Sequence, residues 1–396
     1  MLKLIPQMAT PITFNDLRVG VKGFFPQQNL NKEFETKLTA FFGSKFCYTV
    51  SGGRTALYVM LKALKRLSQK REVVIPVYTC PIVAHAVAKA GLDIVLCDIE
   101  KGSFGLDPAF LEGVITKNTL CVVPTHLFGL PCRLDEIKKV IDSKKVWMVE
   151  DAAQAAGSSL NGAMLGSIGD FGILSFGPGK NFTPAGGGAI LTGKRKWAHE
   201  IDLTIANLPQ LSLFAVFRGL ASLILYSLLI HPRFFRMVRD IAVKVGEVDQ
   251  LRDFTALRLS NYQAAVGISI LERLREVNET RLRNARALIE ALSENESVVI
   301  PKIPEGSQPS FPRLPVMVKD AEQRERVCRR LEERGIQARK PFTTLVNRLE
   351  GVSAVNAASS FPGAEYVVDR ILTLPTHPFV NAKERNAITQ AFNVLD

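Results

Sequence analysis

Short apolar runs alternate with segments of helical periodicity over the first half of the chain. A buried parallel strand is typically a continuous run of apolar residues, whereas a helix packed on a sheet has apolar positions three and four apart. The repeated order of strand and helix therefore predicts an α/β fold with a mostly parallel central sheet flanked by helices. The runs expected to form strands are Phe46–Val50, Val73–Val77, Ile94–Cys97, Leu120–Pro124, Val146–Val149, Phe171–Phe176 and Ala189–Thr192.

The pattern changes in the last third of the chain. From Leu259 the periodicity predicts one long amphipathic helix, and a mixed order of strands and helices follows it. We therefore expect a large domain over 1–258 and a smaller α+β domain over 259–396. The other segments expected are a helix at Asn31–Phe42 with Asn31 as N-cap and Gly43 as its stop, strands at Phe311–Val318 and Ile371–Leu374, and helices at Ala321–Arg334 and 381–394.

Two of the predicted strands end in side chains that carry chemistry. Asp151 follows the run at Val146–Val149, and Ser175 and Lys180 follow at the end of the next run. Since α/β proteins bind ligands where parallel strands end, we expect these groups to face one site. A carboxylate and an amine across a flat ring suit pyridoxal phosphate, whose aldehyde reacts with lysine and whose ring nitrogen needs an anionic partner. The plainer alternative is a surface lysine and a helix-capping aspartate.

A glycine turn after the first strand opens a predicted helix. It reads Ser51–Gly52–Gly53–Arg54–Thr55. Free N–H groups and the helix dipole at such a turn favour a phosphate, although the motif alone is weak evidence.

The stretch from Val146 to Ile190 resembles the pyridoxal-phosphate sugar aminotransferases of the DegT/DnrJ/StrS type, which have fold type I. The motifs that carry this resemblance are Glu150–Gly157, Gly169–Lys180 and Gly187–Ala189. It implies that Lys180 is the Schiff-base lysine and Asp151 the pyridinium partner. It further implies that Gln154 bonds the ring oxygen of the cofactor and that Ser175 bonds its phosphate.

The same resemblance assigns further residues and marks departures from the family. Gly53, Arg54 and Thr55 occupy the segment that binds the cofactor phosphate, with Arg54 in place of a small hydroxyl residue. Cys80 stands where relatives carry an aromatic residue that stacks on the ring, and a core cysteine is the alternative. His126 lies in a histidine-glycine turn beside the cofactor, where a purely structural role is equally open.

The family resemblance implies a homodimer that transfers an amino group to a keto-sugar. We expect an amino-acid donor, glutamate by analogy, and a sugar on a nucleotide or lipid diphosphate in polysaccharide or glycoconjugate synthesis. Sugar recognition does not transfer, because the family's asparagine is absent near Ala256 and its proline-leucine-histidine turn is replaced by Thr344–Val346. The alternatives are a sugar dehydratase, whose relatives often lack the lysine, and a cofactor-binding regulatory protein without turnover.

A twenty-residue apolar segment, 211–230, interrupts the α/β order within an insertion at about 205–245. Arg218 is its only charged residue, and basic residues flank it on both sides. A helix of this length measures ~30 Å, enough to cross a bilayer. A single crossing would separate two parts of one folded unit. We therefore expect the segment to lie in the membrane interface, to dip in and return, or to be buried against protein.

Charge and cysteine content narrow the setting. The formal net charge is +12, which favours acidic partners such as nucleotide phosphates, anionic lipid or nucleic acid. No zinc-finger or RNA-binding signature and no metal-ligand spacing is present, so neither nucleic acid nor a metal is expected. The six cysteines form no CxxC pair, and the N-terminal sequence has no signal-peptide core. These features predict a cytosolic protein, or one that faces the cytosol.

Overall fold

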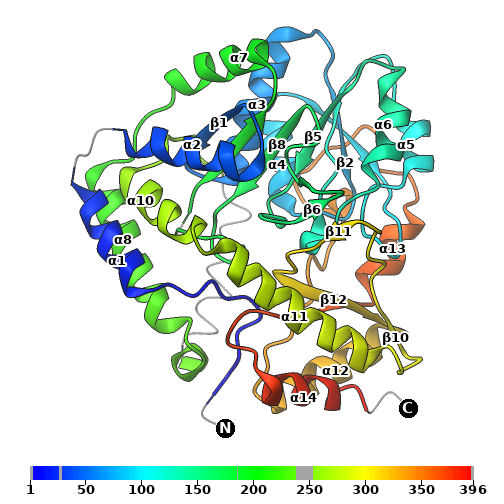
Figure 1. The fold of residues 1–396 in the computed structure, drawn as a ribbon. Helices are drawn as coiled ribbons and strands as arrows, with labels where there is room; N and C mark the ends of the chain where they lie inside the picture. Colours follow the sequence, from blue (N-terminus) through cyan, green and yellow to red (C-terminus); the bar gives the residue numbers. More distant parts are fainter. Residues whose placement is uncertain (1–2, 26–28, 185, 238–252, 394–396) are drawn as a thin grey trace.

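The computed structural model describes residues 3–25, 29–184, 186–237 and 253–393, and its centre is a seven-stranded sheet (Figure 1). The strand order is β1-β9-β8-β5-β4-β2-β3. Only β9 runs against its neighbours, so the predicted α/β class with a mostly parallel sheet is confirmed. The strands are β1 Phe46–Val50, β2 Glu72–Pro76, β3 Asp93–Cys97, β4 Thr119–Val122, β5 Trp147–Asp151, β8 Phe171–Ser175 and β9 Gly188–Thr192.

Helices cover both faces of this sheet, as the burial of alternate residues on β2 demonstrates. Val73 and Ile75 join one apolar core with residues of α3 and α4, whereas Val74 joins a separate core with residues of α5 and α6. Since both faces are covered, the strands read as unbroken apolar runs. The helices of these layers are α3 Gly53–Leu67, α4 Pro81–Lys89, α5 Pro108–Val114, α6 Leu134–Asp142 and α7 Arg195–Ala206.

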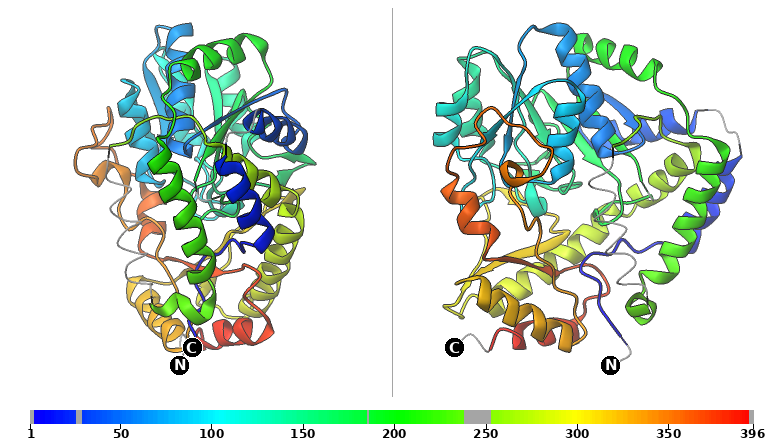
Figure 2. Two further views of the ribbon diagram at one scale, coloured as in Figure 1. Left: turned by 90° about the vertical axis from the view of Figure 1, so that its left-hand side faces the viewer. Right: turned by 180° about the vertical axis from the view of Figure 1, so that it is seen from behind.

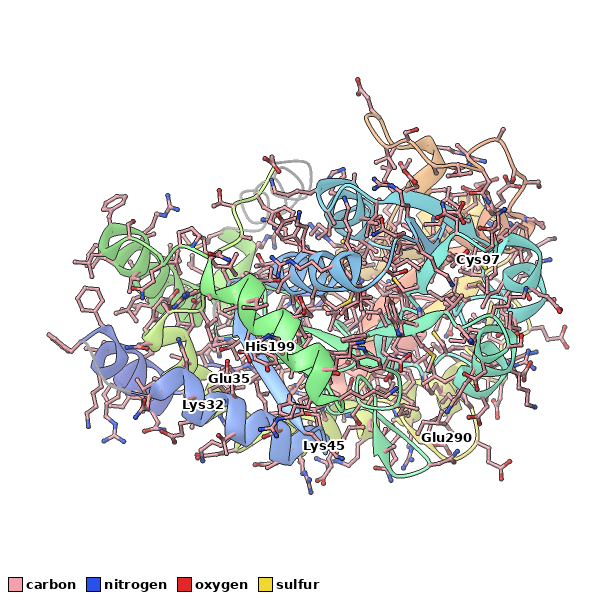
Figure 3. The ribbon with its side chains drawn as sticks, turned by 90° about the horizontal axis from the view of Figure 1, so that it is seen from above. Lys32, Glu35, Lys45, Cys97, His199 and Glu290 are labelled. Atoms are coloured by element: carbon pink, nitrogen blue, oxygen red, sulfur yellow. The ribbon has the colours of Figure 1, made fainter. Side chains whose placement is uncertain are left out.

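Helix α2 (Leu30–Phe42) lies beside β1 at one edge of the sheet. Glu35, labelled in Figure 3, extends from this helix. Its carboxylate accepts a hydrogen bond of 2.9 Å from the backbone N–H of Thr49 and anchors the helix there. The predicted N-cap was wrong: Asn29 precedes the helix, and the Asn31 amide donates to the Leu259 carbonyl at 3.0 Å. The predicted stop is confirmed, since Gly43 takes a left-handed conformation.

The single long helix predicted from Leu259 is also wrong, because it is two helices, α10 (Asn261–Leu271) and α11 (Leu274–Leu292). The break falls at Arg273, whose backbone is not helical. Its guanidinium donates to the Pro11 carbonyl at 3.0 Å and pairs with the buried carboxylate of Asp16 on α1 (Phe14–Phe24). This long-range ion pair holds the chain out of the helical path that its periodicity favours.

The C-terminal part contains a three-stranded sheet of order β10-β12-β13, with helices beside it (Figure 1). The N-terminal segment joins this part, since Ile5 forms a bridge with Ile336. A further small sheet, β11-β6-β7, had no counterpart in the prediction. These elements are β6 Ser159–Leu160, β7 Ala163–Met164, β10 Val298–Val299, β11 Ser307–Gln308, β12 Arg313–Val318, β13 Ile371–Pro375, α12 Ala321–Glu333, α13 Pro362–Val368, α14 Ala382–Gln390 and the short η1 Leu127–Gly129 and η2 Val346–Arg348.

Helix α8 (Leu213–Leu229) contains most of the predicted apolar segment and packs along α1 on one side of the molecule (Figure 2). Its buried residues are Leu220 and Leu223, whereas most of its other large apolar side chains are exposed. Burial on several sides, one of the expected arrangements, is therefore not found within the single chain. None of the helices in the described ranges combines the length and the apolar character that crossing a membrane requires.

Candidate active site

Asp151 and Lys180 lie at the carboxyl ends of neighbouring strands. Asp151 is the last residue of β5, and one of its carboxylate oxygens accepts the backbone N–H of Ala153 at 3.0 Å. Burial raises the pKa of Asp151, while the Ala153 N–H and the charge of Lys180 oppose the rise. Burial lowers the pKa of Lys180, while Cys80 and Asp151 oppose the fall. The structure thus brings the amine and the carboxylate close enough for each to act on the other's charge.

The predicted phosphate segment lies against the end of β8. A Cβ added at Gly53 would lie 2.7 Å from the Cβ of Ser175, so only glycine permits this approach of the turn to the strand. Gly53 is also the first residue of α3, whose N-terminal N–H groups are oriented to receive an anion. The Thr55 hydroxyl is buried and lies 3.2 Å from the Ser51 hydroxyl. Gly53 therefore lies against Ser175, and Thr55 follows it in the first turn of α3.

Two departures from the family lie at the rim of this site. The Arg54 guanidinium lies over the ring of Phe254, with its carbon 5.3 Å from the ring centre. Cys80 is the N-cap of α4. Burial raises the pKa of the Cys80 thiol, and the positive charge of Lys180 opposes this rise. Cys80 thus lies beside the lysine, where the stacking residue was expected.

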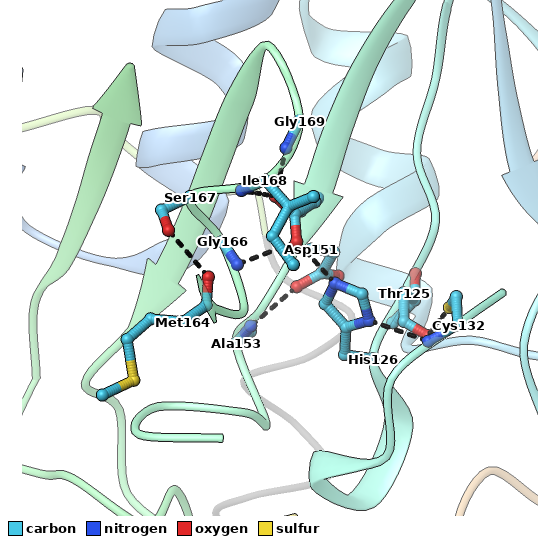
Figure 4. Close-up of polar contacts among 11 residues, drawn as sticks. Thr125, His126, Cys132, Asp151, Ala153, Met164, Gly166, Ser167, Ile168 and Gly169 are labelled. Atoms are coloured by element: carbon cyan, nitrogen blue, oxygen red, sulfur yellow. Dashed lines mark hydrogen bonds and ion pairs between the residues drawn. The ribbon is translucent and has the colours of Figure 1, made fainter. Parts of the chain in front are cut away.

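His126 is bonded at both ring nitrogens (Figure 4). Its Nδ1 accepts the backbone N–H of Cys132 at 3.1 Å, so Nε2 carries the proton and donates to Glu150 at 2.9 Å. Its own backbone N–H donates to the Asp151 carbonyl at 3.0 Å. Because neither ring nitrogen is available to a ligand, His126 acts here by positioning Asp151 and Glu150.

Glu150 is a buried structural carboxylate in the same network. It accepts backbone N–H groups from Gly166 at 2.9 Å, Ile168 at 2.7 Å and Gly169 at 2.6 Å, besides the His126 ring. These four hydrogen bonds connect Glu150 to the loop between β5 and β8 and fix that loop in place. Glu150 therefore holds the loop, whereas its neighbour Asp151 faces Lys180.

Gln154 is held beside η1. Its side-chain oxygen accepts the backbone N–H of Phe128 at 3.2 Å, which orients the amide NH₂ as the group able to donate. The role of Gln154 toward the ring oxygen stays a prediction that this orientation allows.

Arg313, the first residue of β12, was not found from the sequence. It is buried, its Nε has no hydrogen-bond partner among the described residues, and its guanidinium carbon lies 5.3 Å from the ring centre of Phe128. Burial lowers the pKa of Arg313 to about 10. Among the described residues, the groups whose charges act on this pKa are Tyr78, Arg339 and Cys80, none of them a carboxylate, and Arg313 in turn acts on the pKa of Lys180. A buried cation of this kind is suited to bind an anionic substrate group.

A second group missed by sequence reasoning fixes the chain around Lys180. Arg281, buried on α11, donates to the carbonyls of Asn181 and Ala9, each at 2.9 Å. Asn278 donates to the Ala156 carbonyl at 2.9 Å, and the Asn181 amide donates to the same oxygen at 2.6 Å. These side chains hold the residue after the lysine to the loop that follows Asp151. Asn278 and Arg281 lie one turn apart on α11. Their spacing in the sequence indicates a buried side of an amphipathic helix but not a role beside Lys180.

The residues around Asp151 and Lys180 fit a bound pyridoxal phosphate. The hydroxyl oxygens of Thr79 and Thr125 are buried without a hydrogen-bond partner in the described part of the chain. Thr79 precedes Cys80, and the backbone of Thr125 forms a parallel β-bridge with that of Asp151. A buried polar atom without a partner in the chain can bond a ligand or a water. The hydroxyls of Thr79 and Thr125, without a partner among the described residues, can therefore donate to the cofactor ring. The N–H groups at Gly53, in the first turn of α3, can donate to its phosphate.

Comparison with known proteins identifies the class. The family model described as DegT/DnrJ/EryC1/StrS aminotransferase family matches residues 18–218 and 233–393, so the chain belongs to this family and is an aminotransferase. Fold type I and the resemblance of the 146–190 motifs are thereby confirmed.

The relatives extend over nearly the whole chain. The erythromycin biosynthesis sensory transduction protein EryC1 of Saccharopolyspora erythraea is 28% identical over 92% of this chain and 89% of its own. The GDP-perosamine synthase of Escherichia coli O157:H7 is 24% identical over 92% and 90%. The structure of DesI with its TDP-sugar product is similar with a TM-score of 0.79 and 23% identity, covering 100% of this chain and 93% of DesI.

Proposed function

We propose that this enzyme uses pyridoxal phosphate to move an amino group from an amino acid, glutamate by family analogy, to the keto group of a sugar on a nucleoside diphosphate. The observation that carries the proposal is the Lys180–Asp151 pair, beside the buried hydroxyls of Thr79 and Thr125, which have no partner within the described ranges. The names of two relatives support the carrier, since one makes GDP-perosamine and one holds a TDP-sugar. Polysaccharide biosynthesis is the setting that fits these names.

Each side chain has a separate task in this proposal. When bound, pyridoxal phosphate supplies an electron-accepting ring and an aldehyde that carries the amino group. Asp151 holds the ring nitrogen protonated, and Gln154 donates to the ring oxygen. Ser175, Thr55 and the N–H groups at Gly53 bind the phosphate. Arg313 binds the α-carboxylate of the donor.

Lys180 binds the cofactor aldehyde and afterwards acts as the general base. Its lowered pKa gives an uncharged amine at a lower pH than an exposed lysine has, and only that form attacks a carbonyl or accepts a proton. Asp151 keeps its negative charge opposite the ring throughout, which stabilises negative charge developed on the substrate carbon.

The test compares the wild type with Lys180→Ala after each is supplied with pyridoxal phosphate. Wild type should develop the visible absorbance of lysine-bound cofactor, and Lys180→Ala should lack it. Lys138→Ala, which changes an exposed lysine on α6, is the matched control and should behave as wild type. An unchanged Lys180→Ala spectrum rejects the lysine assignment.

A second measurement separates the enzyme from the alternatives. Adding glutamate should convert the cofactor to pyridoxamine phosphate, and a keto-sugar nucleotide should convert it back with formation of an amino-sugar. Loss of the sugar hydroxyl without amine transfer would identify a dehydratase. Cofactor binding with no change on adding donor would identify a regulatory protein.

A further inference from the structure

Helix α8 turns an apolar side outward. At ~100° per residue, six large apolar side chains fall within an arc of about 120°. They are exposed, with Phe214 at 73% and Phe217 at 61% of their free surface. A helix on a water-facing surface normally has the opposite polarity, with its polar side outward. The six residues are Leu213, Phe214, Phe217, Ile224, Leu225 and Leu228.

The inner side of α8 is fixed, so this orientation is a property of the fold. Leu220 and Leu223 are buried against α1, where Gly20 gives them room. The Tyr226 hydroxyl accepts the backbone N–H of Thr10 at 3.3 Å, and the Pro232 carbonyl accepts that of Leu4 at 3.0 Å. Contacts at several points along the helix therefore prevent it from turning its apolar side inward.

Neighbouring segments extend the exposed surface. Helix α1 adds Phe14 and Val21, its C-cap adds Phe25, and the chain after α8 adds Phe234 and Met237. Figure 2, left, looks directly at this side of the molecule, with α8 and α1 in front. We call these five residues and the six of α8 the apolar face. Exposed apolar surfaces of this kind mark contact with a protein or a membrane.

The exposed charged side chains on the described segments that carry the apolar face are basic. Within residues 11–25 and 212–237, the exposed charged residues are all basic. The only acidic residue there, Asp16, is buried and paired with Arg273. A hollow of about 350 Å³ lies just beyond the C-terminal end of α8 and is lined by Lys3, His231 and Arg233, among others. Lys3 is paired there with Glu384 at 2.7 Å. The basic residues of the two ranges are Arg18, Lys22, Arg218, Arg233 and Arg236.

We propose that the apolar face docks on an anionic membrane surface. Helix α8 lies parallel to that surface, with its apolar side chains below the headgroups and the arginines beside the lipid phosphates. Part of the apolar face is not shared with the family, because residues 219–232 fall outside the two ranges that the family model matches. A symmetric contact with a second copy is disfavoured, since it would bring the basic residues of both copies together.

Vesicle flotation of the full-length, cofactor-loaded protein tests this proposal. Wild type should float with vesicles of phosphatidylcholine and phosphatidylglycerol, and far less with phosphatidylcholine alone. Phe217→Asp/Leu225→Asp should lower the bound fraction about tenfold or more, because charges on the apolar arc oppose insertion. Val355→Asp changes an exposed apolar residue elsewhere and should bind as wild type.

A charge variant gives a second test that leaves the apolar residues intact. Arg218→Glu/Arg233→Glu should lose the preference for anionic vesicles. Wild type that stays at the bottom of the gradient with anionic vesicles overturns the proposal. So does a wild-type assembly, seen by sedimentation velocity, that dissociates in Phe217→Asp/Leu225→Asp, since protein would then cover the face. Amino transfer measured without vesicles is independent of either outcome.

Discussion

At the scale of single residues, the site depends on burying two opposite charges together. Burial disfavours the charged form of each, raising the pKa of Asp151 and lowering that of Lys180, while their mutual attraction restores part of both charges. The protonated ring nitrogen of bound pyridoxal phosphate supplies the cation that Asp151 needs. The amine of Lys180 reacts with the aldehyde of the same molecule. The unloaded pair is therefore prepared for a ligand rather than for a permanent ion pair.

Cofactor capture should report the lowered pKa of Lys180. The uncharged amine is the reactive form, and it persists to lower pH in the folded protein than in an exposed lysine. The rate at which unloaded enzyme binds pyridoxal phosphate should rise with pH and level off below the ordinary lysine pKa of ~10.4. Stopped-flow absorbance measures this, with N-acetyl-lysine as the control amine. A midpoint at or above that of the control would contradict the assignment.

Arg313 makes a separate prediction about the donor. Arg313→Met removes a buried cation, and a charge-assisted bond to a carboxylate contributes ~1.5–3 kcal/mol. The KM for glutamate should therefore rise between about tenfold and a hundredfold, with a smaller change in kcat. Arg370→Met, at a cation that lies 4.3 Å over the Tyr366 ring, is the control and should leave KM unchanged. An unaltered KM in Arg313→Met would show that another group binds the donor.

At the scale of elements, apolar runs predicted every strand of the central sheet to within a few residues, because burial on both faces makes that signal strong. The pattern failed where a distant contact decides. The Asp16–Arg273 pair breaks a periodic helix, and the two-residue strands β6 and β7 are too short for any period. Motif resemblance located Lys180 and Asp151, whereas Arg313 lies far from them in the sequence, on β12 of the C-terminal sheet, and reaches the site only through the fold.

The junction of α3 with β8 allows an element-scale test. Ala at Gly53 would place its Cβ 2.7 Å from that of Ser175, so the turn must move away from the strand. A shift costing ~1–3 kcal/mol should weaken pyridoxal phosphate binding about tenfold or more. Gly113→Ala meets no atom within 4 Å and should leave affinity unchanged. Equal cofactor titrations for the two variants would remove the phosphate site from this junction.

At the scale of the whole molecule, the N-terminal segment and α11 connect the loop that contains Lys180 and Asn181 to the C-terminal sheet. Ile5 pairs with Ile336, the Thr10 hydroxyl donates to the Lys180 carbonyl at 2.9 Å, and the Ala9 carbonyl accepts from Arg281. Sequence patterns divide the chain at 258/259, and that boundary stays a prediction. Two of these contacts cross it, those of Ile5 with Ile336 and of Ala9 with Arg281, so the parts that hold the lysine come from both ends of the chain.

Arg281 should therefore matter to the lysine without touching the substrate. Arg281→Met leaves the buried carbonyls of Ala9 and Asn181 without their donor, and each unpartnered group costs ~1–3 kcal/mol. We expect a lower melting temperature and weaker cofactor binding, with the loss of affinity larger than in Arg283→Met, an exposed position on the same helix. Arg281→Lys keeps a cation but not the two-armed geometry, so it should recover stability only in part. If Arg281→Met lost stability yet kept full affinity and an unchanged visible spectrum, the network would support the fold but not the position of Lys180.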